Sequence, residues 1–169
     1  MKNRWIVSDT HFGHKGVTQF LKADGTKVRP WDNPDEMDED MVRMWNELIA
    51  PNDRVYHLGD VVINRRCLPI LDRLNGKKVL IRGNHDIFHL DEYTRYFEDI
   101  RGYNILSKER IIMSHIPVHP SQLERWKANV HGHLHTNVLD DPRYINVCVE
   151  QTDFKPVLLE EVLDKVSKL

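Results

Sequence analysis

The sequence predicts an α/β or mixed layered domain, and two observations support this prediction. Short apolar runs with strand character alternate along the chain with runs that have helical spacing, as in domains whose helices pack on a sheet. Polar clusters rich in His, Asp and Asn follow several of the strand-like runs, which is where α/β domains bind their ligands. With 169 residues, 40% of them hydrophobic, we treat residues 1–169 as one domain with its own core.

The strand-like segments are short apolar runs, beginning with "RWIVS" near the N-terminus. They are typical of strands because they are only a few residues long and rich in Val, Ile and Tyr. We expect strands at residues 4–8, 54–58, 77–81, 103–106, 110–114, 128–131 and 144–150.

The clearest helix covers residues 34–49. Asn33 can accept a hydrogen bond at its start, Pro34 suits the first helical position, and acidic residues follow at the positive end of the helix dipole. Apolar residues recur at three- and four-residue steps and form one stripe, which we expect to pack against a sheet. This stripe contains Met37, Met41, Met44, Trp45, Leu48 and Ile49.

Four shorter helices are predicted along the rest of the chain. We expect them at residues 65–74, at residues 91–98, from Ser121 onward and at residues 158–169. The segment that begins at Ser121 reads "SQLE", which has the Ser-x-x-Glu form of a capping box.

Charge and composition exclude several functional classes. The formal net charge is −2 and the basic residues are scattered, so a large nucleic-acid footprint is not expected. No apolar stretch approaches the roughly 20 residues that cross a membrane, and the N-terminus lacks the apolar segment of a signal peptide. We therefore expect a soluble, cytoplasmic protein with no membrane partner. Cys67 and Cys148 lie in apolar patterns and are interpreted as small buried residues.

Five polar clusters share one position, because each follows a short predicted strand. The carboxyl ends of strands in α/β sheets form a crevice, so these clusters are expected to meet at one place. Their glycines suit a backbone that bends sharply or approaches a ligand closely. The clusters are Asp9-Thr10-His11, Gly59-Asp60, Gly83-Asn84-His85-Asp86, His115 and Gly132-His133-Leu134-His135.

The side-chain types in these clusters indicate a site for divalent metals of intermediate hardness. Asp, His and Asn suit Mn, Fe, Zn or Co, and the absence of Cys argues against a structural zinc finger. Asp9 and His11 are two residues apart, as are His133 and His135, so each pair projects to a common side if the chain there is extended. Seven ligand-type side chains exceed the needs of one ion and suit two ions roughly 3.5 to 4 Å apart that share a carboxylate. They are Asp9, His11, Asp60, Asn84, His115, His133 and His135.

In this order, the five clusters resemble the signature of the calcineurin-like metallophosphoesterases. The first cluster continues as "DTHFGH" (9–14), as in the small single-domain members, and "INVCVEQTDFKPVLLEEV" (145–162) is similar to their tail. The resemblance implies a four-layer αββα sandwich of two mixed β-sheets flanked by helices. It also implies a dinuclear metal site at the strand ends.

The resemblance also assigns a role to each residue of the site. The ligands would divide as Asp9, His11 and His135 for the first ion, Asn84, His115 and His133 for the second, and Asp60 as the bridge. His85 matches the catalytic histidine that binds no metal, and Asp86 matches its orienting partner. The expected cofactors are two divalent metal ions, with Mn²⁺ as the first choice and Fe, Zn, Ni or Co as alternatives.

The activity that follows is dinuclear-metal-dependent hydrolysis of phosphodiester and/or phosphomonoester bonds. A water shared by two cations ionises near neutral pH, so that a metal-bridging hydroxide attacks phosphorus directly, and the cations offset the charge on the phosphoryl oxygens. His85 would stabilise or protonate the leaving oxygen. No Ser or Cys adjoins a recognisable base, so we expect no covalent intermediate.

An alternative hypothesis is that the chain is a catalytically weak binding scaffold of the same fold, similar to the metallophosphoesterase-like subunit of retromer. Such scaffolds lose signature residues, whereas His85 and every ligand are present here, which favours the enzyme. The expected partner is a phosphoester substrate of unknown identity, with nucleic acid or a nucleotide as a possible substrate only. The oligomeric state and the preference for monoesters or diesters stay open.

The roles of several polar residues outside the clusters also stay open. His57 and His131 lie within strands and are interpreted as packed, hydrogen-bonded histidines. His14 either contacts a substrate phosphate or holds its own loop. Arg65 and Arg66 either meet an anionic substrate or lie solvated at the surface.

Overall fold

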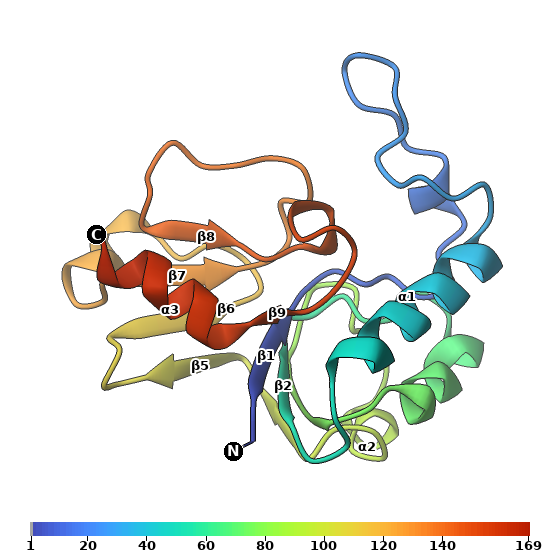
Figure 1. The fold of residues 1–169 in the computed structure, drawn as a ribbon, viewed down its shortest axis with the longest axis horizontal. Coiled ribbons are helices and arrows are strands. Elements are labelled where there is room, and N and C mark those ends of the chain that lie inside the picture. Colours follow the sequence, from blue (N-terminus) through green and yellow to red (C-terminus); the bar gives the residue numbers. More distant parts are fainter. Residues whose placement is uncertain (1) are drawn as a thin grey trace.

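The structure is a computed structural model that describes residues 2–169, and its strands form two mixed β-sheets. Helices flank the sheets (Figure 1). This arrangement confirms the fold class that the sequence and the family resemblance predict.

The first sheet has the strand order β4-β3-β2-β1-β9. Strands β1 to β4 are parallel, and β9 pairs antiparallel with β1 at the edge. In register, Val7 lies beside His57 and His57 lies beside Leu80. The segments that follow these residues therefore leave the sheet at the same edge. The strands are β1 (Arg4–Val7), β2 (Arg54–His57), β3 (Lys77–Ile81), β4 (Asp99–Arg101) and β9 (Val157–Leu158).

The second sheet has the order β5-β6-β7-β8, with β6, β7 and β8 parallel and β5 antiparallel to β6. Ser114 is the register partner of His131, so the residues after β6 and after β7 also leave their sheet together. The strands are β5 (Tyr103–Leu106), β6 (Ile111–Ser114), β7 (Ala128–His131) and β8 (Tyr144–Asn146).

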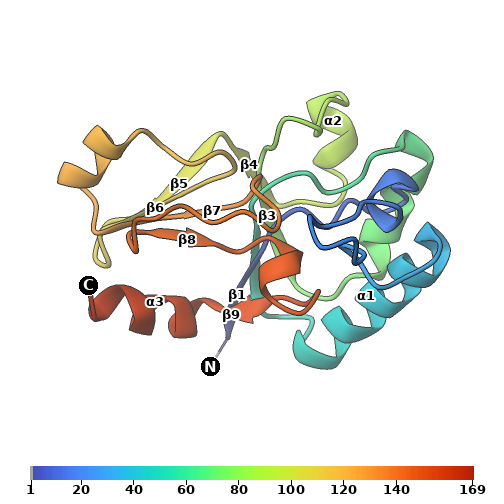
Figure 2. The same cartoon turned by 90° about the horizontal axis from the view of Figure 1, so that it is seen from above.

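Two apolar clusters lie on opposite faces of the first sheet. Along β1, Trp5 and Val7 belong to one cluster, and Ile6, which points the other way, belongs to the second. The first cluster contains buried residues of α1 (Pro34–Leu48) and of α2 (Leu90–Tyr93). The second joins the first sheet to β6, β7 and α3 (Leu159–Ser167). Figure 2 shows α1 and α2 on one side of the first sheet and the second sheet on the other.

Helix α1 forms as its sequence predicts. The Asn33 side chain accepts a hydrogen bond from the Glu36 amide at 3.0 Å, and Pro34 occupies the first helical turn. Of the predicted apolar stripe, Met37, Met41 and Trp45 are buried against the first sheet. Leu48 differs from the prediction, since it is 40% exposed at the end of the helix.

Several shorter predicted elements are wrong in type or extent. Residues 65–73 form a 3₁₀ helix instead of the predicted α-helix, and this helix contains Pro69, which disfavours a regular α-helix because its ring crowds the preceding turn. The helix predicted over residues 91–98 is limited to Leu90–Tyr93; a turn follows it, and strand β4 begins at Asp99. The predicted strand 144–150 ends at Asn146.

The helix predicted from Ser121 is also a 3₁₀ helix, spanning Pro120–Glu124. Its cap is His119, whose side chain accepts from the Ser121 amide. The capping box that the sequence predicts at Ser121 is therefore wrong. The two short edge strands β4 and β9 are not predicted, because segments of three and two residues carry too little pattern.

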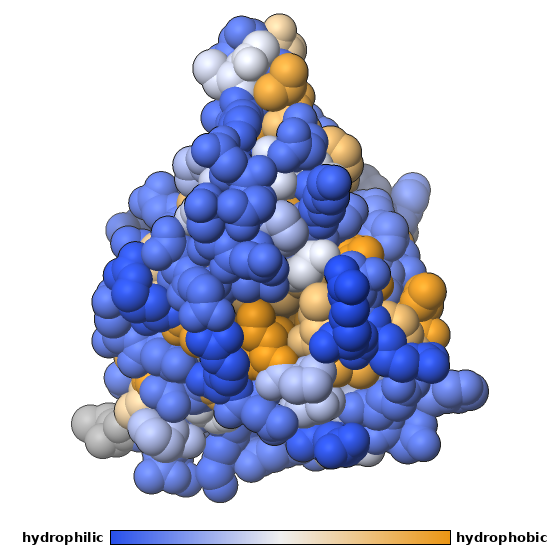
Figure 3. Space-filling model, turned by 90° about the vertical axis from the view of Figure 1, so that its right-hand side faces the viewer, coloured by the Kyte–Doolittle hydropathy of each residue, from blue (hydrophilic) through white to orange (hydrophobic). Residues whose placement is uncertain are grey.

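A hairpin-like loop over residues 20–28 projects from the body of the molecule (Figures 1 and 3). Its arms are joined by hydrogen bonds from Lys22 to Thr26 at 2.7 Å and from Val28 to Phe20 at 2.8 Å. Within residues 2–169, no helix is both long enough and apolar enough to cross a membrane.

Candidate metal centre

The two sheets deliver the predicted ligand segments to one place. Hydrogen bonds between backbone atoms join the segments that follow β1 and β2, from Asp9 to Gly59 and from His11 to Asp60, both at 3.0 Å. The second sheet is tied to the first by the His133 amide, which donates to Asp9 Oδ2 at 2.8 Å. The five polar clusters that lie far apart in the sequence therefore share one site.

The backbone of this site is unusual, because several side chains that face it come from left-handed residues. Asp9 (φ 60°), His11 (φ 51°), Asp60 (φ 54°), His133 (φ 67°) and His135 (φ 49°) all have positive φ. This conformation is uncommon for residues other than glycine and stores strain that the surrounding structure must hold. The extended chain that the sequence analysis assumed for each two-residue pair is therefore wrong, and sharp turns aim the side chains instead.

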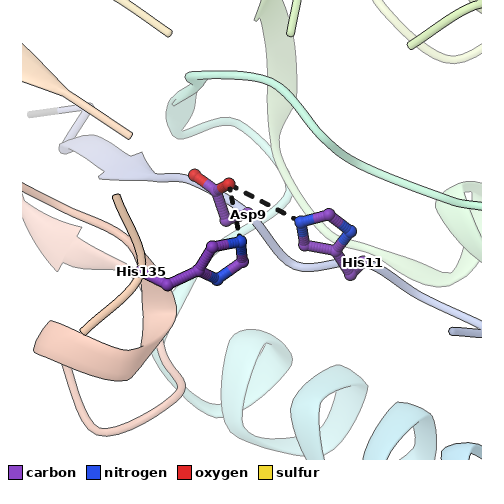
Figure 4. Close-up of side chains that lie close together, drawn as sticks. All are labelled: Asp9, His11 and His135. Carbon is purple, nitrogen blue, oxygen red and sulfur yellow. Dashed lines mark ion pairs between the residues drawn. The ribbon is translucent and has the colours of Figure 1, made fainter. Parts of the chain in front are cut away.

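The first ligand group contains Asp9, His11 and His135 (Figure 4). One ligand atom from each lies within 4.8 Å of the others. Asp9 Oδ1 is 3.6 Å from Nε2 of His11 and 3.6 Å from Nε2 of His135. Among the described residues, Asp9 Oδ1 and both ring nitrogens of His11 are buried without a hydrogen-bond partner. Unpaired buried polar atoms are rare in proteins, and a cation would satisfy Asp9 Oδ1 and one of the two His11 ring nitrogens.

Hydrogen bonds to the other oxygen of Asp9, Oδ2, hold the carboxylate in place. Oδ2 accepts from the Ser8 hydroxyl at 2.6 Å and the Cys148 thiol at 3.1 Å, in addition to the His133 amide. Burial alone would raise the pKa of Asp9, but the His11 contact, the charge of His115 and the Ser8 bond together hold it well below its usual range. The carboxylate is therefore ionised at neutral pH and presents Oδ1 to the site.

The second ligand group contains Asp60, His115 and His133, and Asn84 joins it. His115 Nε2 lies 2.9 Å from Asn84 Oδ1, 3.2 Å from His133 Nδ1 and 3.4 Å from Asp60 Oδ2. His115 Nδ1 donates to the Leu58 carbonyl at 2.7 Å, so in the neutral ring Nε2 carries a lone pair. The oxygens of Asp60 and Asn84 both face Nε2, so positive charge among these atoms is favourable. Burial opposes it, but the Asp60 contact raises the pKa of His115, and a divalent cation would supply the same charge to this donor set.

Asp60 belongs to both groups. Its Oδ2 is 3.6 Å from His11 Nε2 in the first group and 3.4 Å from His115 Nε2 in the second. Its Oδ1 accepts from the His85 amide at 2.8 Å, which fixes the carboxylate. Burial alone would raise the pKa of Asp60. The hydrogen bond and the positive charge of His115 have the larger opposite effect, so the pKa of Asp60 lies below its ordinary value. The donor set and its arrangement thus fit two divalent ions that share one carboxylate.

Two glycines are required by close packing around the ligands. A Cβ on Gly132 would overlap Ser8 Oγ and Asp9 Oδ2, and a Cβ on Gly83 would overlap Asp60 Oδ1. Both glycines lie where a neighbouring loop presses against a ligand carboxylate. They explain why the predicted clusters contain glycine beside the ligands.

His85 and Asp86 follow the ligand Asn84 but lie in different environments. The His85 side chain is exposed, and its ring centroid is 5.6 Å from that of His11. Asp86 is buried and accepts from the amides of Asp60 at 2.8 Å, Gly83 at 2.8 Å and Val61 at 3.0 Å. Its carboxylate therefore holds the loops that carry the ligands. The catalytic role of His85 and the orienting role of Asp86 stay predictions.

Comparison with known proteins places this geometry in a family. The family described as calcineurin-like phosphoesterase matches residues 3–165. The chain belongs to the calcineurin-like phosphoesterases. This result confirms the resemblance that the five clusters indicate.

Two relatives and one solved structure are similar to this calcineurin-like phosphoesterase over nearly their whole lengths. An uncharacterized protein of Methanocaldococcus jannaschii, MJ1445, is 32% identical over 179 residues that cover 99% of this chain and 93% of the relative. The Gene 66 protein of Mycobacterium phage D29 is 26% identical over a match that covers 100% of this chain and 98% of the phage protein. A crystal structure of the Aquifex aeolicus protein AQ665, of unknown function, superposes with a TM-score of 0.73 at 26% identity, covering 96% and 98% of the two chains.

The other histidines near the centre are structural in this calcineurin-like phosphoesterase or lie at its edge. His57 is buried, with Nε2 3.0 Å from Thr10 Oγ1 and Nδ1 accepting from the Gly59 amide at 3.2 Å, in agreement with the prediction that it packs. His131 is also buried, with Nδ1 2.8 Å from the Gly132 carbonyl. The His14 ring lies 5.5 Å from that of His11, and burial and nearby positive charge lower the pKa of His14 to about 4.

The two arginines whose roles the sequence leaves open lie outside the ligand groups. Arg65 pairs with Glu92 at 3.0 Å and its guanidinium lies 5.3 Å from the Phe88 ring centroid. Arg66 lines a surface hollow together with Cys67 and Asp38. The two cysteines differ from each other, since Cys148 is buried, as expected, and Cys67 is half-buried.

Sequence reasoning misses two buried charged residues at the first ligand group, Arg29 and Glu150. Glu150 Oε1 is 3.0 Å from His135 Nδ1 and 2.7 Å from Arg29 Nη2. Glu150 lies in the segment predicted as a strand, where an acidic side chain is expected to face solvent. Arg29 lies in a loop, where no periodic pattern predicts burial. The one available signal was an acidic residue that directly follows the apolar run "VCV".

We predict that Gly132→Ala lowers the stability of the metal-free protein by about 1–3 kcal/mol, the usual effect of overpacking. The added methyl would displace Ser8 and Asp9, so Mn²⁺ binding should weaken as well. Urea denaturation and titration calorimetry measure the two effects. Gly102→Ala is the control, because a Cβ there meets no atom within 4 Å. Equal behaviour of the two variants would contradict the packing argument.

A second prediction concerns pH. Burial lowers the pKa of His57 from 6.5 to about 3, so between these values the unfolded chain binds a proton that the folded protein does not. The stability of the metal-free protein should therefore fall as the pH falls through this window, by about 1.4 kcal/mol per pH unit from this residue. Urea denaturation between pH 7 and pH 4.5 should show a shallower slope for His57→Gln. Parallel slopes for wild type and variant would refute the assignment.

Proposed function

We propose that this chain is a dinuclear-metal-dependent phosphoesterase that hydrolyses phosphodiester and/or phosphomonoester bonds by direct attack of water activated between the two ions. The observation that carries the proposal is the position of Asp60. Its Oδ2 lies within 3.6 Å of a ring nitrogen in each ligand group, as a bridging carboxylate requires. Family membership supports the same class of reaction.

The metal ions would supply two things when bound, an acidified water and positive charge against the phosphoryl oxygens. The residues of this chain hold them. Asp9, His11 and His135 would bind the first ion, and Asn84, His115 and His133 the second. The nitrogen and oxygen donors suit Mn²⁺, which we propose as the working ion, and Fe, Zn, Ni or Co fit the same donors.

We assign His85 to the leaving group. Its amide is fixed to Asp60 Oδ1 at 2.8 Å, while its ring is exposed beside the site. An imidazole in this position can hold a proton at the leaving oxygen or stabilise the charge that develops there. Asp86 would act through the backbone, by fixing the loop that carries His85.

Room for a phosphoester lies beside the second ligand group. A hollow of about 330 Å³ is lined by Asn84, His115, Arg82, Ser114 and Ile116, together with two glycines. Such a hollow accommodates part of a nucleotide or another small phosphoester. We propose a phosphoester in solution as the partner, with the cytoplasm as the location.

The activated water has no rival nucleophile in the residues next to Asp9. The Ser8 hydroxyl and the Cys148 thiol are both buried and both donate to Asp9 Oδ2. Burial and the charge of Asp9 also raise the pKa of the Cys148 thiol, which removes the thiolate that could attack. These contacts support a reaction without a covalent enzyme intermediate.

The protein reconstituted with Mn²⁺ should hydrolyse bis(p-nitrophenyl) phosphate and lose this activity when a chelator removes the metal. His85→Ala should lower kcat by about 10²- to 10⁴-fold, the usual contribution of a general acid or base. Bound Mn²⁺, measured by elemental analysis, should stay at two ions per chain.

His119→Ala serves as the control for this experiment, because His119 is exposed and caps a 3₁₀ helix outside both ligand groups. Its activity should match that of wild type. Equal rates for His85→Ala and wild type would remove His85 from the mechanism. Two bound ions without turnover of any phosphoester would favour the binding scaffold instead.

The direct attack also predicts the stereochemistry at phosphorus. A single displacement by water inverts the configuration, whereas a covalent enzyme intermediate requires two displacements and retains it. Hydrolysis of a chiral, isotopically labelled phosphoester should therefore proceed with inversion, as determined by ³¹P NMR of the product. Net retention would rule out the direct attack.

A further inference from the structure

A buried ion pair lies behind the first ligand group. The side chain of Arg29 is 0% exposed and that of Glu150 is 2% exposed. Arg29 donates to Glu150 Oε1 from Nε at 2.9 Å and contacts the same oxygen from Nη2 at 2.7 Å. Two charges are buried in this way only when they are paired and hydrogen-bonded, so the position of each depends on the other.

The pair reaches one ligand directly. Glu150 Oε1 is 3.0 Å from His135 Nδ1. Since a carboxylate only accepts, Nδ1 carries a proton, and in the neutral ring Nε2 presents its lone pair, 3.6 Å from Asp9 Oδ1. A carboxylate behind a ligating histidine fixes the ring and makes its free nitrogen a stronger donor to a metal.

Arg29 also contacts the backbone of the turn that carries the other two ligands of the first group, Asp9 and His11. Arg29 Nη2 donates to the Asp9 carbonyl at 2.6 Å, and Nη1 donates to the Thr10 carbonyl at 2.7 Å. These carbonyls belong to the left-handed turn that aims Asp9 and His11. One guanidinium therefore holds the turn with two ligands and, through Glu150, the loop with the third.

Among the residues that the structure describes, the histidines of the second ligand group have no matching carboxylate behind them. There, His115 Nδ1 donates to the neutral carbonyl of Leu58, which polarises the ring less than a carboxylate does. Asn84 is an uncharged ligand and is exposed. Within the first group, His135 therefore has a more strongly polarising support than His115 has in the second.

We propose that Glu150, held in place by Arg29, is a positioning residue that makes the Asp9–His11–His135 group the tighter of the two metal positions. This inference rests on the dinuclear centre of the proposed function. It adds an order of filling, in which the first group binds its ion at lower metal concentration than the second.

Titration calorimetry of the metal-free protein with Mn²⁺ tests the proposal without any substrate. Wild type should bind two ions in two separable steps. Glu150→Gln should weaken the tighter step by about 10- to 100-fold, the usual effect of removing such a support, and leave the weaker step unchanged. Asn84→Ala, which removes a ligand of the second group, should remove the weaker step alone.

Two further variants control for loss of stability. Asp53→Asn removes another buried carboxylate, which accepts from Trp5 Nε1 at 2.9 Å and contacts no ligand. It should leave both binding steps unchanged. Glu150→Asp keeps the charge beside Arg29 but draws it away from His135, so it should weaken the tighter step even if Glu150→Gln does not fold.

The outcomes separate this inference from the proposed function. Fewer than two ions bound by wild type would overturn the dinuclear centre itself. Two ions bound by wild type, with the weaker step or neither step shifted in the Glu150 variants, would overturn the role of Glu150 and leave the centre intact. Loss of the tighter step in Asn84→Ala would overturn the assignment of that step to the first group.

Discussion

The central constraint in this protein is electrostatic, because acceptor atoms from several loops face one another at a single point. Asp60 Oδ2 lies 3.6 Å from His11 Nε2 and 3.4 Å from His115 Nε2, which is itself 2.9 Å from Asn84 Oδ1. Such atoms repel unless positive charge lies between them. Where neither a histidine proton nor a metal ion supplies that charge, the fold must hold an arrangement that is unfavourable by itself. Metal binding would turn this repulsion into attraction, so stability and metal binding should be coupled.

The holding force comes from the loops and from the carboxylates behind them. Left-handed residues aim five of the seven ligands, and backbone bonds between loops keep those residues in place. Asp86 binds three amides of two ligand loops, and the Arg29–Glu150 pair fixes the third region of the site. The strain of these five residues lies in loops, and no left-handed residue lies within a strand of residues 2–169.

Much of this arrangement could be predicted from the sequence, for physical reasons. Strands and the helix from Pro34 follow local patterns, and the ligands follow strand ends, where the sheet topology gathers them. The left-handed turns could not be predicted, because non-glycine residues adopt them only under tertiary contacts. The 3₁₀ helix at Arg65–Arg73 was mistaken for an α-helix because both share similar apolar spacing. Arg29 and Glu150 were missed because burial of a charge depends on a partner 121 residues away.

The same limit applies to the carboxylates of the site. Asp9, Asp60 and Asp86 all follow strands, all are buried, and nothing in their local sequence separates ligand from support. The structure separates them by hydrogen bonding. Both oxygens of Asp86 accept from backbone amides, whereas Asp9 Oδ1 has no partner among the described residues and faces two imidazoles. A carboxylate whose lone pairs are all used by amides holds the chain, and one that keeps a lone pair toward other acceptors is built to hold a cation.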